Sequence, residues 1–560
     1  MRNKILKLRL RKSLDRLKME VILQRHLRIL LLCCFIVAGG IAQSTDIPDH
    51  LRTRAESITA ARLAHDVEFL SSDLFRGRAT PSPGLDSAAA VVVSRLKQAG
   101  VKPMGDKGGY LQYYTVHEHI ADTASAFLEV GGKRFRFGEV FVINRFVPVN
   151  ASAEVVYVGH GYFAPAFGVD AYKGVDVKGK FLLVHGPGIV PAGLRTGRLT
   201  GEVSPPIWEA ARRGALGILY AGSPHMLEGW DRLRRSNLRR RELDPSVPSA
   251  YAAPASPAVV LHPQALQAVI EGESAKSFDL FPEAEERTYP ASFVLKSKVT
   301  LHLPAASHQV HRPANVVAMI EGSDSKLRQE YITIAAHLDG AVGTEAVNGD
   351  SIYNAADDNA TGTAALIAMA EAFQQGPRPR RSVIFLWDSG EEVGLWGTRW
   401  FVHNPPVPLD RIVAHFNIDM IGGTRVPGTN VKGEEGLTGP HEVYLVGPRV
   451  LSAVADSILI QTNRAYLNMS FNRFYDDPAK EFFYPRTDAG PFLERGILTI
   501  GYFTGLHPRY HEPSDEAEYL DPVKMETVAR TAFVTAWMLA DRPERVGIDK
   551  PLPSSVPRYR

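Results

Sequence analysis

Four apolar stretches, each typical of a buried strand, lead into side chains that bind metal ions in proteins. They are residues 334–339, 387–392, 416–419 and the segment after 497–503, which bring His337, Glu391 with Glu392, Asp419 and His511. In a doubly wound α/β sheet, ligands bind at the carboxyl ends of the strands. We therefore expect these side chains to meet at one edge of a sheet.

A fifth candidate lies in the polar loop at 354–362, which holds Asp357 and Asp358 and ends in Gly362 before a predicted helix. Two histidines and three carboxylates suit two zinc ions with one carboxylate bridging them. The prediction is a site for two Zn²⁺ ions built from nitrogen and oxygen ligands.

The two glutamates of the doublet Glu391-Glu392 can have different roles in a hydrolase. Adjacent side chains at a strand end point in different directions, so one can bind metal while the other takes a proton from water. Asp339 is two residues from His337 on an extended segment, so it falls on the same side and can orient the imidazole. We expect structural roles for the remaining histidines that the pattern leaves outside, which are His117, His119, His308, His311 and His507.

Hydrophobic patterning predicts an α/β fold with a mostly parallel, doubly wound sheet. Strands are expected at 331–336, 383–387, 412–418 and 497–503, and the clearest helices at 361–374 and 521–540. Residues 58–100 also read as helical. Short β-like runs between 135 and 300 indicate a separate inserted module.

The N-terminus has the pattern of a secretory signal. A basic segment to Arg28 precedes the apolar run 29–38 and a small-x-small step at Ala42, so we expect cleavage there. An uncleaved anchor and a start at Met19 instead of Met1 are the alternatives. Cleavage removes both cysteines, Cys33 and Cys34, which leaves histidines and carboxylates for metal chemistry.

Charge and composition exclude several classes of protein. Residues 1–28 carry ten Lys or Arg and two acidic residues, which gives this segment a charge of +8. The whole chain has a net charge of +3, so residues 29–560 have a net charge of −5. A mildly acidic body offers no electrostatic basis for binding nucleic acid. With 45% apolar and 22% charged residues among 560, the chain is an ordinary globular protein of several domains.

These motifs resemble the di-zinc metallopeptidase family that includes bacterial leucyl-type aminopeptidases, plasma glutamate carboxypeptidase, glutamate carboxypeptidase II and the non-catalytic transferrin receptor. The resemblance covers about residues 55–540 and rests on the segments 336–339, 354–362, 390–397, 417–420 and 510–515.

The resemblance implies a role for each candidate. Asp357 would bridge both zinc ions, Glu392 and His511 would complete one site, and His337 and Asp419 the other. Glu391 would be the general base and Asp339 the partner of His337. The resemblance also implies a cis peptide bond after the bridging aspartate, at Asp357-Asp358. Apart from the resemblance, Tyr510 lies beside the expected ligand His511 in the sequence, so we expect it to donate a hydrogen bond to the oxyanion.

The insert at 135–300 resembles a protease-associated domain through residues 156–161, 170–180 and 211–219. Such domains usually cover or frame the substrate cleft. Two positions depart from many relatives, because Gly340 and Ala489 stand where histidines are common. The resulting domain boundaries are 1–42 for the signal peptide, 43–134 and 301–542 for the peptidase domain, 135–300 for the insert and 543–560 for a polar tail.

The leading hypothesis is a periplasmic or secreted aminopeptidase that acts on peptides. A glutamate-releasing carboxypeptidase, for which Arg486 and Arg495 could bind a substrate carboxylate, is the alternative among peptidases. A receptor-like homologue without activity and a glutaminyl cyclase with one zinc are further alternatives. We expect peptide substrates, no nucleic acid and no membrane partner after signal cleavage, with a homodimer left open.

Overall fold

The computed structural model describes residues 47–553, with gaps at 187–189, 191–193, 195–202, 239, 248–255, 274–290, 341, 344, 429–430 and 478–485. The predicted signal segment 1–42 lies outside the described residues, and so do residues 554–560 of the predicted tail. Across the described part of the chain, no helix is long and apolar enough to cross a membrane.

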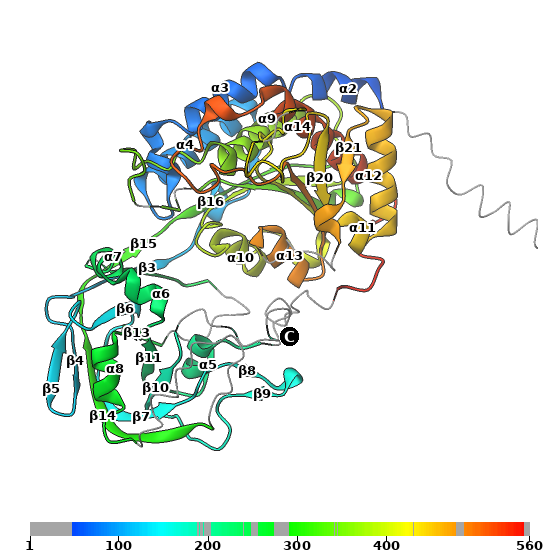
Figure 1. Ribbon diagram of the computed structural model, residues 1–560. Helices are drawn as coiled ribbons and strands as arrows, with labels where there is room; N and C mark the ends of the chain where they lie inside the picture. Colours follow the sequence, from blue (N-terminus) through cyan, green and yellow to red (C-terminus); the bar gives the residue numbers. More distant parts are fainter. Residues whose placement is uncertain are drawn as a thin grey trace, which may run out of the picture. The chain divides into compact units, whose positions relative to one another are not determined.

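The strands predicted to carry the site belong to a nine-stranded mixed sheet, here called the first sheet (Figure 1). Its order is β1–β16–β18–β17–β19–β22–β20–β21, with β2 also paired to β16. The strands are β1 (Lys102–Pro103), β2 (Leu111–Tyr113), β16 (Ala314–Ile320), β17 (Tyr331–His337), β18 (Ser382–Asp388), β19 (Ile412–Ile418), β20 (Glu442–Val446), β21 (Ser470–Asn472) and β22 (Leu498–Phe503). The neighbours β18, β17, β19 and β22 are parallel, which confirms the predicted core, whereas β16 and β20 run antiparallel to it.

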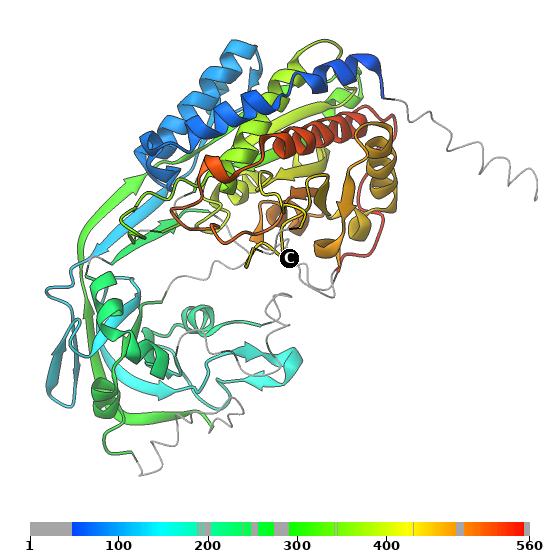
Figure 2. The same ribbon diagram turned by 45° about the horizontal axis from the view of Figure 1, so that its top comes forward.

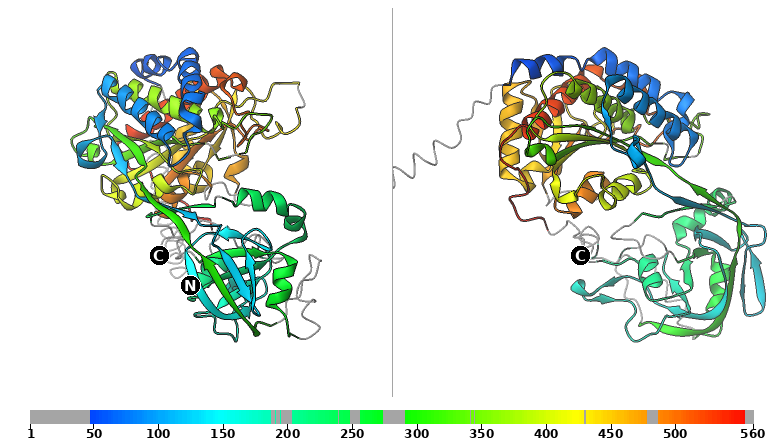
Figure 3. Two further views of the ribbon diagram at one scale, coloured as in Figure 1. Left: turned by 90° about the vertical axis from the view of Figure 1, so that its left-hand side faces the viewer. Right: turned by 180° about the vertical axis from the view of Figure 1, so that it is seen from behind.

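Helices cover both faces of this sheet. One layer holds α2 (Asp49–Glu56), α3 (Ala60–Leu70), α4 (Pro83–Ala99), α9 (Gly362–Gln374) and α14 (Pro522–Ala540), and α12 (Ala453–Ala465) packs against α14 (Figure 2). The opposite face is covered by α10 (Trp396–His403) and α13 (Ala489–Glu494), and α11 (Pro448–Leu451) contacts β22. Both layers can be followed from behind in Figure 3.

Local sequence explains why the elements that carry the site form where they do. The strands β17, β18 and β19 are buried along almost their whole length, as their continuous apolar runs predict. The alanine-rich helix α9 is buried nearly all round, and α14 begins at Pro522 with the side chain of Asp521 capping two backbone amides. A rigid, two-sided core therefore fixes the strand ends.

A second, eight-stranded sheet forms the insert, in the order β5–β4–β14–β7–β10–β11–β13–β6. It uses β4 (Phe127–Val130), β5 (Lys133–Arg136), β6 (Phe141–Arg145), β7 (Val149–Tyr157), β10 (Phe181–Val184), β11 (Gly217–Ala221), β13 (Ala258–Leu261) and β14 (Phe293–Leu303). The helices α5 (Pro206–Arg212), α6 (Pro224–Glu228), α7 (Trp230–Ser236) and α8 (Pro263–Val269) and the pair β8 (Phe163–Ala164) and β9 (Val169–Asp170) belong to the same segment.

The boundaries expected for the insert, 135 and 300, are both misplaced. The first divides the hairpin β4–β5, whose strands pair from Phe127↔Arg136 to Val130↔Lys133, and the second divides β14. A further three-stranded sheet, β12 (Arg241–Pro245), β3 (Val116–Ala121) and β15 (Ala305–His311), also belongs to it. The chain thus leaves the first sheet after Tyr113 and returns at Ala314.

Candidate active site

The four central strands bring the predicted side chains to one edge of the sheet. His337 is the last residue of β17, Asp419 follows β19 directly, and the Glu391-Glu392 doublet lies three residues beyond β18. His511 follows β22 after a loop. Because these strands are parallel neighbours, their carboxyl ends lie together, as the sequence predicts.

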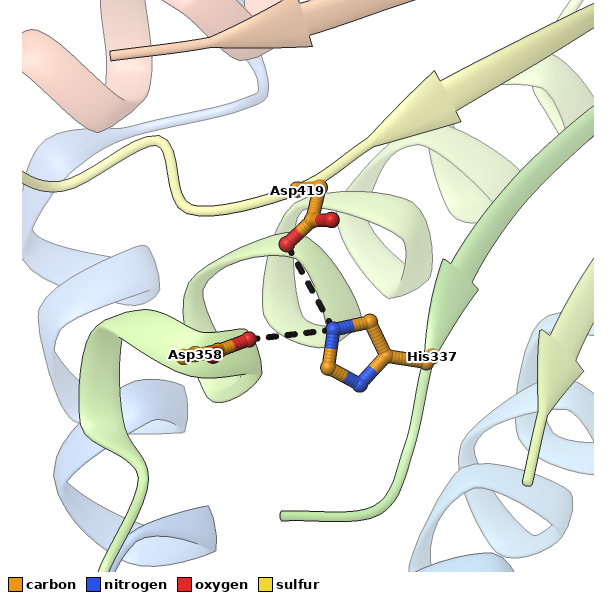
Figure 4. Close-up of side chains that lie close together, drawn as sticks. All are labelled: His337, Asp358 and Asp419. Carbon is orange, nitrogen blue, oxygen red and sulfur yellow. Dashed lines mark ion pairs between the residues drawn. The ribbon is translucent and has the colours of Figure 1, made fainter. Parts of the chain in front are cut away.

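The first group of side chains, here the His337 cluster, consists of His337, Asp358 and Asp419 (Figure 4). His337 Nε2 lies 3.1 Å from Asp358 Oδ1 and 3.4 Å from Asp419 Oδ1. The His337 side chain is 1% exposed, whereas that of Asp419 is 16% exposed, so solvent reaches this group from the side of Asp419.

The second group, here the His511 cluster, consists of Asp358, Glu392 and His511. His511 Nε2 lies 3.1 Å from Asp358 Oδ2 and 3.1 Å from Glu392 Oε2. Each oxygen of the Asp358 carboxylate therefore faces a different histidine, and the two clusters share this residue.

The shared carboxylate is that of Asp358, so the expectation that Asp357 occupies this position is wrong in the structure. Asp357 is turned away: it accepts a hydrogen bond from the amide of Gly422 at 2.8 Å, and its Oδ2 lies 3.2 Å from His507 Nε2. The turn η7 (Ala356–Thr361) that opens α9 causes this difference, because its backbone is not helical at Asp358. The cis peptide bond follows the shared residue, at Asp358-Asn359.

Two residues that sequence reasoning left out support this turn. His507, expected to have no carboxylate beside it, contacts Asp357, and Asp515 accepts hydrogen bonds from the amides of Asp357 and Asp358 at 3.0 and 3.1 Å. The sequence signal for His507 is its spacing of four residues from His511. The signal for Asp515 is its position at the end of the 510–515 motif. Burial raises the pKa of Asp515 to about 7.

A buried arginine fixes two of the loops that carry the site. Arg78 is 1% exposed and donates to the carbonyl of Leu338, next to His337, and to the carbonyls of Asn354 and Ala355, which precede Asp358. A further bond reaches Leu70 O. Burial lowers the pKa of Arg78 to about 10, so the group remains a cation at neutral pH beside the acidic site.

Asp339 connects His337 to the glutamate doublet. His337 Nδ1 lies 3.2 Å from the backbone carbonyl of Asp339, nearer than the 3.9 Å to its carboxylate. The carboxylate accepts a hydrogen bond from the amide of Glu391 at 3.2 Å. The contact predicted between Asp339 and His337 is thus present, with the main chain as the nearer partner.

Glu391 belongs to neither cluster among the described residues. Burial raises its pKa well above the usual value, because the charge of His337, which acts against this rise, is outweighed by burial together with nearby carboxylates such as that of Asp488. A half-buried carboxyl with a raised pKa next to candidate metal ligands is suited to accept a proton.

Tyr510, Gly340 and Ala489 each lie beside a residue of the two clusters. The ring of Tyr510 stacks on His511 with a centroid distance of 3.6 Å, and burial raises its pKa, which keeps the hydroxyl protonated. Gly340 has no room for a side chain, because a Cβ there would lie 2.4 Å from Cβ of Ala355. Ala489 lines a small pocket beside Asp419 with Val446, Tyr502 and Phe503.

Charge is strongly unbalanced at this edge of the sheet. Burial disfavours the imidazolium of His337, but the carboxylates of Asp358 and Asp419 outweigh it and raise the pKa of His337 well above the usual value. In the same way Asp358 and Glu392 raise the pKa of His511 to about 9, and burial raises that of Glu392 to about 8. Buried carboxylates attract cations, and here they hold protons on the histidines.

The donor atoms fit divalent zinc. His337 Nε2, Asp419 Oδ1 and His511 Nε2 are buried atoms without a hydrogen-bond partner among the described residues, although each lies close to the other ligands. Such convergence is costly unless a cation lies between the groups. Imidazole nitrogens and carboxylate oxygens are the ligands that zinc takes in hydrolases.

A family model described as "Peptidase family M28" matches residues 315–536, which span β17, β18, β19, β22 and all residues of both clusters. The chain contains a peptidase family M28 domain. The aminopeptidase from Aneurinibacillus sp. strain AM-1 shares its fold, with a TM-score of 0.52 and 17% identity over 92% of this chain and 100% of that one.

Curated relatives match parts of this chain at low sequence identity. A "Probable zinc metalloprotease" of Pyricularia oryzae is 24% identical over 47% of this chain and 58% of its own length. A "Probable lipoprotein aminopeptidase LpqL" of Mycobacterium tuberculosis is 24% identical over 39% of this chain and 43% of its own length. The chain spans 56–65% of the length of the first curated relatives it matches.

Proposed function

We propose that the chain is an exported M28 aminopeptidase that holds two zinc ions and removes N-terminal residues from peptides. One observation carries this proposal: the Asp358 carboxylate faces His337 with one oxygen and His511 with the other, while Glu391 stands outside both clusters. That arrangement provides two ligand sets and a separate base.

In this proposal His337 and Asp419 hold one zinc, Glu392 and His511 hold the other, and Asp358 holds both. Zinc bound there supplies Lewis-acid polarisation of the substrate carbonyl and activates water at neutral pH. The buried Arg78 and Asp515 keep the loop that carries Asp358 in place from behind.

Glu391 moves the proton. Its carboxylate accepts the proton of the attacking water and passes it to the amine that leaves as the peptide bond breaks. The Asp339 carboxylate accepts a hydrogen bond from the backbone N–H of Glu391 at 3.2 Å, so the base is positioned by the same residue that contacts His337.

Two groups at the rim would handle the substrate. The protonated hydroxyl of Tyr510 donates a hydrogen bond to the oxygen that becomes negative at the transition state. The pocket beside Asp419, lined by Val446, Ala489 and Tyr502, has room for about one water molecule, so only a small apolar side chain would fit next to the scissile bond.

A glutamate-releasing carboxypeptidase is the second candidate, and one observation favours it. The positive charge of Arg486 lies close enough to Tyr510 to act against the rise of the pKa of that tyrosine. A guanidinium at the rim of the site could bind the carboxylate of a substrate in a bidentate manner.

Substrate panels separate these functions. The purified chain should cleave aminoacyl 4-nitroanilides and unblocked dipeptides, and acetylation of the substrate amine should abolish cleavage. Release of C-terminal glutamate from N-blocked peptides would establish the carboxypeptidase instead. Turnover of neither group by zinc-loaded protein would leave the receptor-like alternative.

The basic segment followed by the apolar run 29–38 supports export, and the resemblance of the insert supports a protease-associated domain. N-terminal sequencing of protein recovered from the periplasm or medium tests the first, with Gln43 as the expected first residue. Retention of Met1 or Met19 in a membrane fraction would show an anchor instead.

A further inference from the structure

The base Glu391 lies in a loop between β18 and α10 that is closed by its own backbone. This loop, here called the base loop, spans residues 389–397. At its ends the amide of Gly397 donates to the carbonyl of Ser389 at 2.7 Å, and in its middle the amide of Gly394 donates to the carbonyl of Glu391 at 3.0 Å. Because the loop is bonded to itself at both levels, a shift of its ends moves Glu391.

Asn315 on β16 joins the two ends of the base loop. Its Nδ2 donates to the carbonyl of Gly397 at 2.8 Å, and its Oδ1 accepts from the amide of Ser389 at 3.2 Å. A carbonyl at one end and an N–H at the other allow only this orientation of the side-chain amide. Asn315 is fully buried, so bulk water cannot take over either bond.

The approach of Asn315 to the loop is close. A Cβ at position 397 would lie 2.1 Å from Oδ1 of Asn315 and 2.5 Å from the carbonyl oxygen of Ser389, so Gly397 is the residue that permits this contact. On its other side, Asn315 Nδ2 also donates to Oε1 of Gln112 at 3.1 Å. The amide is thus held on β16 and transmits that fixed position to the loop.

Tyr114 supports the same end of the loop. Its hydroxyl lies 3.0 Å from the carbonyl oxygen of Ser389 and 3.0 Å from Ser389 Oγ. Burial raises the pKa of Tyr114 well above the usual value, so the hydroxyl keeps its proton and can donate. A Cβ at Gly390 would lie 2.9 Å from this hydroxyl. Tyr114 therefore contacts the two residues that directly precede Glu391.

We propose that Asn315 and Tyr114 are positioning residues for the base Glu391. Neither belongs to the two clusters, so they act on hydrolysis through the base loop. Asp339 holds the middle of this loop, at the amide of Glu391, and Asn315 holds its ends. The inference rests on the proposed function, in which Glu391 moves the proton.

Steady-state kinetics on an aminoacyl 4-nitroanilide in excess Zn²⁺ give the first test. Asn315→Leu should lower kcat by about 10–100-fold with a near-native KM, because a displacement of about 1 Å can cost that much. Tyr114→Phe removes one hydroxyl and leaves the ring, so kcat should fall only about 2–10-fold.

Asn463→Leu is the matched control. Asn463 on α12 is also buried, and its side chain donates to the carbonyl of Met469 at 2.8 Å and accepts from the amide of the same residue at 2.9 Å. This variant loses an equivalent pair of bonds away from the base loop, so kcat should match the wild type. An equal fall of kcat in Asn463→Leu and Asn315→Leu would overturn the proposal.

A double-mutant cycle separates positioning of the base from a general loss of structure. In Glu391→Gln protein, Asn315→Leu should lower kcat by less than about twofold further, because residues that act as a unit are not additive. A further loss as large as that in the wild-type background would show that Asn315 does not act through Glu391.

Hydrogen exchange measured by mass spectrometry does not depend on catalysis. Peptides that cover residues 389–397 should exchange at least about tenfold faster in Asn315→Leu than in the wild type, and at the wild-type rate in Asn463→Leu. A wild type that hydrolyses no substrate would remove the proposed function, and this measurement would still decide whether Asn315 fixes the loop. Unchanged exchange of the base loop in Asn315→Leu would overturn the inference.

Discussion

Oδ1 of Asp358 lies 3.1 Å from Nε2 of His337, across the space between the start of α9 and the end of β17. The other oxygen of the same carboxylate faces His511 at the same distance. Asp357, its neighbour in the chain, instead faces His507. One aspartate of the pair therefore connects the two candidate metal sites, and the other supports the turn behind them.

The first prediction separates these two aspartates. Asp358→Asn should remove both zinc ions, because each cluster loses a charged oxygen ligand. Asp357→Asn should keep most of the zinc, because its carboxylate contacts the amide of Gly422 and the ring of His507. Metal analysis after gel filtration measures both. Equal zinc loss in the two variants would contradict the assignment of Asp358 as the shared ligand.

The second prediction concerns the base. Glu391→Gln should retain both zinc ions and a near-native KM, while kcat falls by about 10²–10⁴, the usual contribution of general acid–base catalysis. The matched variant Glu392→Gln should lose zinc as well as activity, because Glu392 belongs to the His511 cluster. Full turnover by Glu391→Gln would show that this glutamate is structural.

The third prediction concerns Arg78, which donates to four backbone carbonyls. Arg78→Met leaves these buried acceptors unsatisfied, so the free energy of unfolding should fall by at least about 2 kcal/mol. Zinc should also dissociate about 10–100-fold more readily, because the loop before Asp358 loses its support.

Arg52→Met is the control for this variant. Arg52 is only partly buried, and its side chain donates to the carbonyl of Ala465, away from both clusters. Denaturant unfolding and zinc competition with a chelator should show a small loss of stability and no change in zinc affinity. Equal effects of the two substitutions on zinc would contradict the role given to Arg78.

The fourth prediction is a pH dependence that does not involve the candidate metal ligands. His415 on β19 is buried, lies 3.0 Å from Thr333 Oγ1 and stacks on Phe492, and burial lowers its pKa to about 3. The unfolded chain takes up a proton near pH 6.5 and the folded chain does not, so this contribution to stability is complete above pH 6.5 and is lost as the pH falls towards 3.

Between pH 7 and pH 5 this histidine should cost about 2 kcal/mol of stability. The free energy of unfolding should therefore fall less steeply over that interval in His415→Leu than in the wild type. Other groups titrate in both proteins, so only the difference between the two slopes is diagnostic. Parallel slopes would show that His415 is not held neutral in the fold.

Sequence patterns located the strand ends well but could not resolve the loop. His337 and Asp419 follow continuous apolar runs, and a parallel sheet brings such ends together whatever the loops do. The Asp357-Asp358 pair is different, because the direction of each carboxylate depends on the turn η7, whose backbone is not helical. The resemblance points to the correct pair of aspartates, but it assigns the shared position to Asp357, whereas the structure places Asp358 there.

The insert shows a similar limit. Its apolar strands, such as 181–184 and 258–261, were recognisable, but β3 and β15 are rich in histidine and polar residues and carry no clear β pattern. Pairing across almost 200 residues, from Val116 to His311, makes them strands. His507 was likewise missed because its partner Asp357 is 150 residues away in sequence.

Zinc content tests the central claim most directly. Wild-type protein, loaded with zinc and then freed of loosely held ions by gel filtration, should retain two zinc ions per chain. Removal of both by a chelator should abolish hydrolysis of aminoacyl substrates, and Zn²⁺ should restore it. Retention of one ion or none by active protein would contradict a site in which Asp358 holds two.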